Sequence, residues 1–146
     1  MYKGKKILGI ITARGGSKGI PRKNIKELCG KPLIAYTTEA AEASKYLTRY
    51  IVSTDDSEIA EISRRYGADV PFMRPPELAQ DKSTSLEVIQ HALRKLKDDF
   101  GEEYDYAMIL QPTSPLRTST DIDACVVLAV DNDADSVMSM VVVQDF

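Results

Sequence analysis

The sequence lacks several features on which whole classes of protein depend. Among its 146 residues there are no Trp, one His and two Cys. Cys29 and Cys125 lie far apart and form no CxxC pair, so neither a zinc site nor a disulfide framework is indicated. No apolar run approaches the roughly 20 residues that span a bilayer, and the segment before Ile7 does not resemble a signal peptide. We therefore expect a cytoplasmic protein without a membrane segment.

The composition that remains is typical of a single folded domain. Hydrophobic residues make up 43% of the chain and charged residues 28%, with a net charge of -3. These proportions argue against intrinsic disorder. Because a domain usually holds roughly 100 to 200 residues, the whole chain is expected to form one unit.

Positive charge is concentrated in one short segment. Between Ala13 and Lys26 there are five basic residues and no acidic residue, whereas all 22 acidic residues lie elsewhere. A nucleic-acid-binding protein more often spreads basic charge over a face, while one short loop matches the size of a single polyphosphate. A small anion, and not a nucleic acid, is therefore the expected ligand.

Apolar runs and amphipathic segments alternate along the chain. We expect strands at Ile7–Thr12, Tyr50–Thr54, Val70–Met73, Ala107–Leu110 and Ser136–Val143. We expect helices at Leu33–Ser44, Asp56–Tyr66, Thr84 to about Gly101, and Thr118–Val130. This order predicts an α/β fold of three layers, with helices on both faces of an open, mostly parallel sheet. Ligands of such sheets bind at the carboxyl ends of the strands.

Capping patterns predict where two of the helices begin. Asp55 with Glu58 fits the start of the second helix, and Thr84 with Glu87 fits the start of the third. One face of the third helix is expected to be apolar, with Leu86, Ile89, Leu93 and Leu96. The acidic groups at 55–56, 121–123 and 131–135 lie at helix ends, where acids favour the positive end of the helix or face water. They are interpreted as structural and not as metal ligands.

The glycine-rich loop after the first strand has the features of a phosphate-binding loop. It reads Ala13-Arg14-Gly15-Gly16-Ser17-Lys18-Gly19-Ile20-Pro21-Arg22-Lys23-Asn24. Its glycines let backbone N–H groups approach a phosphate, its cations neutralise charge, and its proline stiffens the turn. It is not a P-loop, because the order of Ser17 and Lys18 is reversed, and the dinucleotide-binding glycine spacing is absent. A solvated basic turn is the structural alternative.

Four motifs in order resemble the acylneuraminate cytidylyltransferase family. They are this loop, Arg74–Asp81 (RPPELAQD), Val88–Leu93 (VIQHAL) and Leu110–Arg117 (LQPTSPLR). The resemblance implies a Rossmann-like fold of the nucleotide-diphospho-sugar transferase type. It also implies that the anomeric hydroxyl of an acidic nine-carbon sugar, such as a sialic acid, attacks the α-phosphate of CTP and releases pyrophosphate.

The resemblance assigns roles to twelve residues. Arg14 and Lys23 would be the catalytic pair that stabilises charge on the α-phosphate and the leaving pyrophosphate. Nucleotide-binding residues would be Gly15, Ser17, Lys18, Asn24, Arg74 and Ser85. Residues that bind the sugar would be Gln111, Thr113, Ser114 and Arg117. His91 is left out, because it has no acid, serine or cysteine partner in a recognisable arrangement and is expected to pack structurally.

The resemblance also implies Mg²⁺ and a homodimer. In that family the metal is held by an acidic motif downstream of the last apolar run, and this sequence has no such motif. We therefore expect the metal ligands to be absent and residues 1–146 to be the nucleotide-binding, N-terminal part of a longer cytidylyltransferase, truncated at its C-terminus. Two alternatives stay open: a cytidylyltransferase for another sugar acid, such as a keto-deoxyoctulosonate, and a non-catalytic CTP-binding domain.

Overall fold

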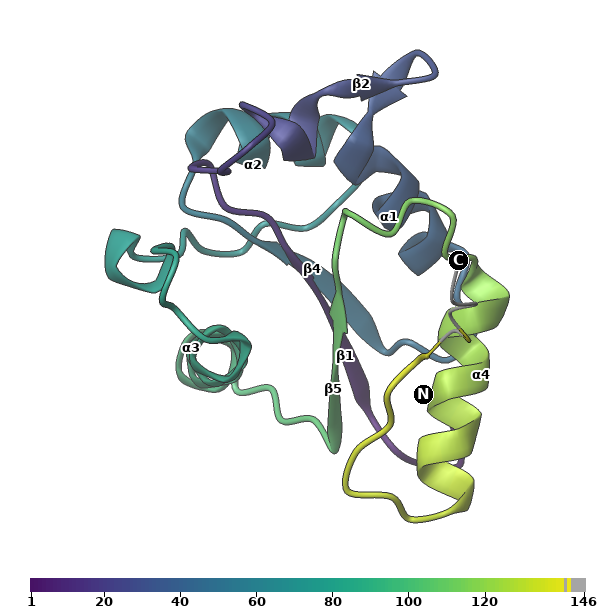
Figure 1. Cartoon of the computed structure of the whole chain (residues 1–146). Helices are drawn as coiled ribbons and strands as arrows, with labels where there is room; N and C mark the ends of the chain where they lie inside the picture. The colour runs from purple at the N-terminus through teal and green to yellow at the C-terminus, as the bar shows by residue number, and fades with distance from the viewer. Residues whose placement is uncertain (141, 143–146) are drawn as a thin grey trace.

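A three-stranded parallel sheet forms the centre of the molecule. The computed structural model describes residues 1–140 and 142. Strand β1 (Ile7–Thr12) lies between β4 (Arg49–Ser53) and β5 (Tyr106–Leu110), as Figure 1 shows. Ile10 stands opposite Ile51 on one side and Ile109 on the other. The predicted parallel sheet is confirmed, and the loop that follows β1 leaves from its middle.

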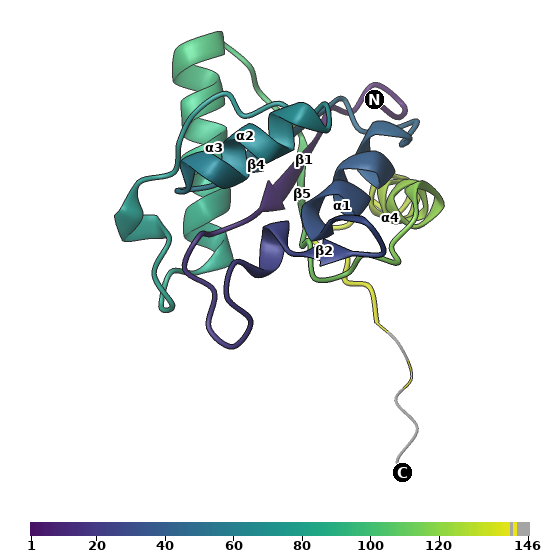
Figure 2. The same ribbon diagram turned by 90° about the horizontal axis from the view of Figure 1, so that it is seen from above.

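Helices cover both faces of this sheet. Helices α1 (Leu33–Glu42), α2 (Ser57–Arg65) and α4 (Ser119–Asp131) pack on one face, in a cluster that includes Ile34, Ile59 and Ile122. Helix α3 (Ser85–Phe100) packs on the other face through Ala92 and Leu96. Figure 2 shows α3 on one side of the strands and α1 and α4 on the other. The predicted three-layer α/β fold is therefore confirmed, and no helix within residues 1–140 and 142 is long and apolar enough to cross a membrane.

The capping prediction is confirmed for α3 and shifts by one residue for α2. The Thr84 side chain accepts the Glu87 N–H and Glu87 reaches back, which completes a capping box. For α2 the N-cap is Asp56, whose carboxylate accepts the Ile59 N–H at 2.9 Å. Asp55, the predicted N-cap, instead points toward the loop after β1. Because two acids are adjacent in the sequence, either could be the N-cap of α2. The Asp55 carboxylate accepts the Gly15 N–H of the loop, and Asp56 caps the helix.

The predicted apolar face of α3 is wrong at its first residue. Leu86 is 61% exposed, while the fully buried positions are Val88, Ala92 and Leu96. The i, i+4 spacing of these three residues sets the line along which α3 meets the sheet. Leu86 precedes Val88 by two residues, about half a turn, and therefore faces away from that line.

Two predicted strands are wrong. Val70–Met73 makes no ladder with β4, because only the flanking bonds from Val52 N–H to the Asp69 carbonyl and from Arg74 N–H to the Thr54 carbonyl form. Pro71, between them, has no N–H to donate. Residues 136–140 are not a strand either, and Met138 and Met140 are more than 80% exposed. The remainder of that predicted strand includes residues 141 and 143, which lie outside the described residues.

The sequence patterns do not predict a small hairpin and two 3₁₀ helices that the structure contains. Strands β2 (Glu27–Leu28) and β3 (Lys31–Pro32) pair antiparallel, and the two residues between them, Cys29 and Gly30, both have positive φ. Two positive φ angles in a two-residue loop define the tight turn that fits the twist of a hairpin. The 3₁₀ helices are η1 (Lys23–Ile25), which follows the glycine-rich loop, and η2 (Pro76–Leu78), which precedes α3.

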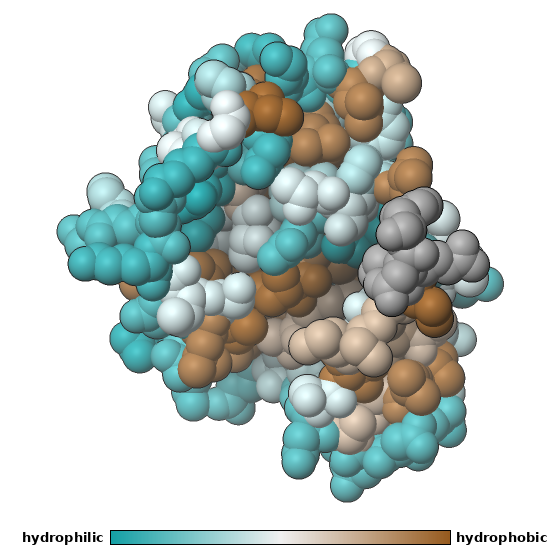
Figure 3. All heavy atoms as spheres, in the orientation of Figure 1, coloured by the Kyte–Doolittle hydropathy of each residue, from teal (hydrophilic) through white to brown (hydrophobic). Residues whose placement is uncertain are grey.

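An apolar surface stays open beside β5. Within residues 1–140 and 142, β5 pairs only with β1, and Tyr106–Ile109 are half-buried. Figure 3 shows hydrophobic atoms across the centre of the face that Figure 1 presents.

Candidate active site

A cavity of about 190 Å³ opens at the carboxyl ends of the three strands. It is bounded by the loop after β1, the segment that leads into α3, and the loop after β5. The lining residues are Thr12, Arg14, Ser17, Lys23, Asn24, Arg74, Ser83, Thr84, Ser85, Val88, Gln111, Pro112 and Thr113. The site therefore lies where the sheet topology predicts it.

Eight of the twelve residues singled out in the sequence line this cavity. They are Arg14, Ser17, Lys23, Asn24, Arg74, Ser85, Gln111 and Thr113. The other four, Gly15, Lys18, Ser114 and Arg117, lie outside its lining. The fold thus brings these eight residues together from four separate segments of the chain, namely the loop after β1, Arg74, Ser85 and the loop after β5.

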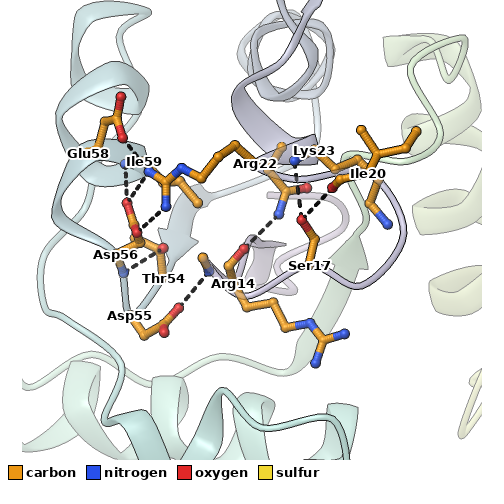
Figure 4. Close-up of polar contacts among 12 residues, drawn as sticks. Arg14, Ser17, Ile20, Arg22, Lys23, Thr54, Asp55, Asp56, Glu58 and Ile59 are labelled. Atoms are coloured by element: carbon orange, nitrogen blue, oxygen red, sulfur yellow. Dashed lines mark hydrogen bonds and ion pairs between the residues drawn. The ribbon is translucent and has the colours of Figure 1, made fainter.

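The N-terminal end of α2 holds the loop after β1 in place. The Gly15 N–H donates to Asp55 Oδ1 at 2.9 Å, and Arg22 Nη1 lies 2.6 Å from Asp56 Oδ2, with a further contact to Glu58. Figure 4 shows Arg22 reaching across to these carboxylates. The hydrogen bond from Arg22 holds the pKa of Asp56 below its usual range. Gly15 and Arg22 therefore hold the loop against α2.

Gly15 is required by a close approach and not by an unusual backbone angle. A Cβ built on it would lie 2.7 Å from Asp56 Oδ2 and 2.9 Å from the Asp56 Cβ. At Gly16, by contrast, nothing lies within 4 Å of such a Cβ. The first glycine lets the loop pack on Asp56, while the second leaves space on the open side.

Two polar side chains fix the inner course of the loop. Ser17 Oγ donates to the Ile20 carbonyl at 2.8 Å and accepts the Lys23 N–H at 3.3 Å. Asn24, which is buried, donates through Nδ2 to the Arg14 carbonyl at 3.1 Å. These bonds fix the backbone on which Arg14 and Lys23 stand, so both cations belong to one rigid turn.

A single carboxylate connects two of the cations in this loop. Arg14 Nη1 lies 2.7 Å from Asp81 Oδ1, and Lys18 Nζ lies 2.6 Å from Asp81 Oδ2. Lys18 is 78% exposed and stands outside the cavity lining, while Arg14 contributes to it. These two ion pairs hold the pKa of Asp81 below its usual range, Lys18 having the larger effect.

Arg74 is a buried cation whose partners are backbone carbonyls. It is 6% exposed and donates to the Ser53 carbonyl at 3.0 Å and to the Leu78 carbonyl at 3.2 Å. Among the described residues no carboxylate pairs with it, and its Nε has no hydrogen-bond partner. Burial lowers the pKa of this guanidinium. Arg74 thus places a desolvated positive charge in the cavity wall, which favours an electronegative ligand atom there.

The remaining walls come from α3 and from the loop after β5. Ser83, Thr84 and Ser85 give the first turn of α3 a polar rim, and Val88 adds an apolar surface. On the other side Gln111 and Thr113 line the cavity with Pro112 between them. This arrangement offers hydroxyl and amide groups along with one apolar contact, which suits a ligand with both ring and polar atoms.

Ser114 and Arg117, both predicted to bind substrate, lie away from the cavity. Ser114 N–H donates to the Gln111 carbonyl at 3.2 Å, and Arg117 Nη2 donates to the same carbonyl at 3.4 Å. Burial lowers the pKa of Arg117, while Cys125 and Asp121 act in the opposite direction. In the described structure these two residues support the backbone of the loop after β5.

Metal ligands do not gather in the described part of the chain. Within residues 1–140 and 142, no group of three His, Cys, Asp or Glu side chains is arranged to hold a metal ion. Asp55 and Asp56 are engaged with the loop, and Asp121 caps α4. Asp123 accepts the Ser44 hydroxyl at 2.6 Å and the N–H groups of the turn before β4.

Comparison with known proteins identifies the family. The family model described as "Cytidylyltransferase" matches residues 8–145. The chain belongs to the cytidylyltransferase family. Cytidylyltransferase relatives include the N-acylneuraminate enzyme of Escherichia coli, 49% identical over 80% of this chain and 26% of its own length. The pseudaminic acid cytidylyltransferase of Campylobacter jejuni is 45% identical over 76% of this chain and 47% of its own length.

Solved cytidylyltransferase structures share the fold. A CMP:2-keto-3-deoxy-manno-octonic acid synthetase complexed with CTP matches with a TM-score of 0.75 at 23% identity, over 88% of this chain and 49% of that one. A cytidylyltransferase from Leptospira borgpetersenii matches with a TM-score of 0.65 at 24% identity, over 88% of this chain and 50% of that one. This chain spans between a quarter and a half of the length of the curated cytidylyltransferases named above.

Several residues that line the cavity are not among the site residues predicted from the sequence. They are Thr12, Ser83, Thr84, Val88 and Pro112. Thr84 carries a capping signal, which explains its place in the helix but not its place in the wall. Asp81 is the last residue of the motif Arg74–Asp81, and the resemblance gives it no role. Its negative charge, opposite to that of the basic loop, is the feature of the sequence that could have suggested its ion pairs with Arg14 and Lys18.

Proposed function

We propose that this chain is the nucleotide-binding part of an enzyme that transfers CMP from CTP to an acidic nine-carbon sugar and releases pyrophosphate. One observation carries the proposal. Arg14, Lys23 and the buried Arg74 converge on one cavity at the carboxyl ends of the strands, together with polar groups from α3 and the loop after β5. Three cations around a small polar cavity fit a nucleotide better than a neutral metabolite.

The reaction requires stabilisation of charge more than a nucleophilic side chain. The anomeric oxygen of the sugar loses its proton to water and bonds to the α-phosphorus, while the bond from that phosphorus to the bridging oxygen breaks and pyrophosphate leaves with that oxygen. Arg14 and Lys23 would stabilise negative charge on the α-phosphate and on the leaving group. The hydrogen bonds of Ser17 and Asn24 support this role, since they fix the loop backbone from which both side chains project.

The remaining predicted residues divide between the two substrates. Arg74 and Ser85 would contact the cytidine nucleotide, and Gln111 and Thr113 would face the sugar. Gly15 would contribute by placing the loop backbone, and Lys18 by attracting phosphate at the mouth of the site. Ser114 and Arg117 would act on the sugar through the loop that they support.

The sugar acid is proposed from the relatives. Proteins 44 to 49% identical to this chain are named for N-acylneuraminate, pseudaminic acid and diacetyllegionaminic acid. Transfer to a keto-deoxyoctulosonate is the second candidate, favoured by the fold shared with the octonic acid synthetase. The higher sequence identity to the first group favours a nine-carbon acceptor.

Two measurements test the proposed function. Calorimetric titration of the chain with CTP, GTP, UTP and ATP should show preferential binding of CTP. Pyrophosphate release by the full-length protein, with CTP and each sugar acid in turn, should identify the acceptor. Preferential CTP binding with no pyrophosphate release from any sugar acid would instead support a non-catalytic CTP-binding domain. Equal binding of all four nucleotides would overturn the assignment to CTP.

We also propose that the full-length protein is a cytoplasmic homodimer that uses Mg²⁺ with CTP. The ligands of the metal would come from outside the described residues, which contain no suitable cluster. Light scattering on the full-length protein tests the dimer, and cell fractionation tests the location. Titration of Mg²⁺ into the pyrophosphate-release assay, with EDTA as the reverse experiment, tests the metal.

A further inference from the structure

The ion pairs of Asp81 involve cations of the very loop assigned to the phosphates. Both of its carboxylate oxygens are used, one by Arg14 at 2.7 Å and the other by Lys18 at 2.6 Å. A carboxylate held by two cations has the charge and the acceptor geometry that a phosphate oxygen pair would present. Asp81 therefore occupies the donors that an incoming polyphosphate requires.

Asp81 lies beside the opposite wall of the cavity, just outside its lining. It lies in the segment between η2 and α3, two residues before Ser83, which lines the site. Local turn bonds hold this segment, including Ser83 N–H to the Gln80 carbonyl at 3.0 Å and Ser83 Oγ to the Glu77 carbonyl at 3.1 Å. The pairs with Arg14 and Lys18 connect this segment to the loop after β1, so the carboxylate connects two walls.

Because the Asp81 side chain is exposed, breaking its ion pairs with Arg14 and Lys18 should require little free energy. Its side chain is 48% exposed, and water can replace the two cations as hydrogen-bond donors. Ion pairs of this exposure contribute little net free energy, because solvent screens them. A polyphosphate carries several negative charges and more acceptor oxygens, so it should outcompete one carboxylate for Arg14 and Lys18.

We propose that Asp81 is a built-in counterion which the polyphosphate of the nucleotide displaces, and that it thereby sets the affinity of the site for polyphosphate. This rests on the proposed function only in naming CTP as the ligand. A ligand that takes the Arg14 Nη1 and Lys18 Nζ donors now paired with Asp81 breaks both pairs, whereas a ligand that reaches neither cation breaks none. Asp81 lowers the affinity for CTP and pyrophosphate and leaves the affinity for cytidine unchanged.

The Asp81→Asn variant tests this by calorimetry with CTP, inorganic pyrophosphate and cytidine at low salt. We expect the Kd for CTP and for pyrophosphate to fall by about threefold to tenfold, as removal of two exposed competing pairs predicts. The Kd for cytidine should stay within about twofold, and the gain should shrink in high salt. Asp99→Asn is the matched control, because Asp99 is exposed and pairs with Lys95 at 2.8 Å within α3.

Each outcome decides between specific alternatives. Unchanged or weaker binding of CTP and pyrophosphate by Asp81→Asn would overturn the inference and make Asp81 a residue that orients the cations. Equal gains in Asp81→Asn and Asp99→Asn would also overturn it, since net charge alone would then explain both. Asp81→Ala replaces Asp81→Asn if circular dichroism shows the first variant unfolded. If the wild type binds pyrophosphate but not CTP, and Asp81→Asn strengthens pyrophosphate, the counterion role stands while the proposed function fails.

Discussion

Arg22 Nη1 lies 2.6 Å from Asp56 Oδ2, so one cation of the basic loop faces a helix terminus and not the cavity. Arg22 takes a left-handed backbone conformation, with φ of 54°, at the point where the loop turns back into η1. Its neighbour Lys23 lines the cavity. Two adjacent cations thus have different tasks, one structural and one proposed to be catalytic.

Replacement of Arg22 by Met should loosen the loop. It removes the pair with Asp56 and the contact with Glu58, and should lower the free energy of unfolding by about 1 kcal/mol because both groups are partly exposed. CTP binding should weaken as the loop loses its anchor. Arg65→Met is the control, since Arg65 pairs with Glu61 on the open surface of α2 and should change either quantity very little. Equal effects of Arg22→Met and Arg65→Met on stability and on CTP binding would contradict the proposal that Arg22 anchors the loop. Urea unfolding and calorimetry give both values.

The two adjacent glycines should respond differently to Ala. Gly15→Ala places a Cβ against Asp56 and should cost about 1 to 3 kcal/mol of stability, the usual range for overpacking. Gly16→Ala meets no atom within 4 Å and should leave the stability within about 0.5 kcal/mol of wild type. Thermal and urea unfolding of the two variants test this difference. A Gly16 variant as destabilised as the Gly15 variant would contradict it.

Loss of the proposed catalytic cations should reduce turnover far more than loss of the histidine. In the full-length protein, Arg14→Ala or Lys23→Ala should lower the rate of pyrophosphate release by about 10² to 10³, as for the loss of one donor to developing charge. His91→Ala should remain within about threefold, because His91 lies outside the cavity and packs edge-on against Phe72 at 5.2 Å. A folded His91 variant that loses as much turnover as the other two would contradict the assignment.

The same histidine should make stability depend on pH in a narrow window. Burial first, and then Lys95, Arg74 and Arg94, hold the pKa of His91 below its usual value. Between that folded value and the unfolded value of about 6.5, the unfolded state binds more protons, so stability falls as pH drops through this window. As the pH falls from about 7 to about 5, the free energy of unfolding should decrease less for the His91→Gln variant than for the wild type.

NMR titration reads the pKa directly, because His91 is the only histidine in the sequence. A pKa of about 6.5 or higher in the folded protein would contradict the prediction. Parallel stability curves of the wild type and the His91→Gln variant would do the same.

The periodic segments could be predicted from the sequence because local rules determine them. The apolar run Ile7–Thr12 became β1 with the same bounds, and the Thr84 capping box begins α3 where expected. The glycine-rich loop falls at a strand end for the same reason, since strand and loop are adjacent in the chain. Eight of the predicted site residues then meet in one cavity because parallel strands bring their carboxyl ends to one edge.

Where the local sequence fits two structures equally well, only the tertiary structure determined which one forms. Asp55 and Asp56 are equally good N-caps by type, and the position of the Gly15 N–H separates them. Val70–Met73 has the composition of a strand, but a strand also needs a partner that accepts and donates along its length.

The pairing of Asp81 with Arg14 joins residues 67 positions apart, which no local pattern encodes. Sequence by itself therefore determined the elements, the order of the motifs and the position of the basic loop in the chain. The fold decided which charges face the cavity and which face each other, because that depends on distances between segments that meet only after the sheet has formed.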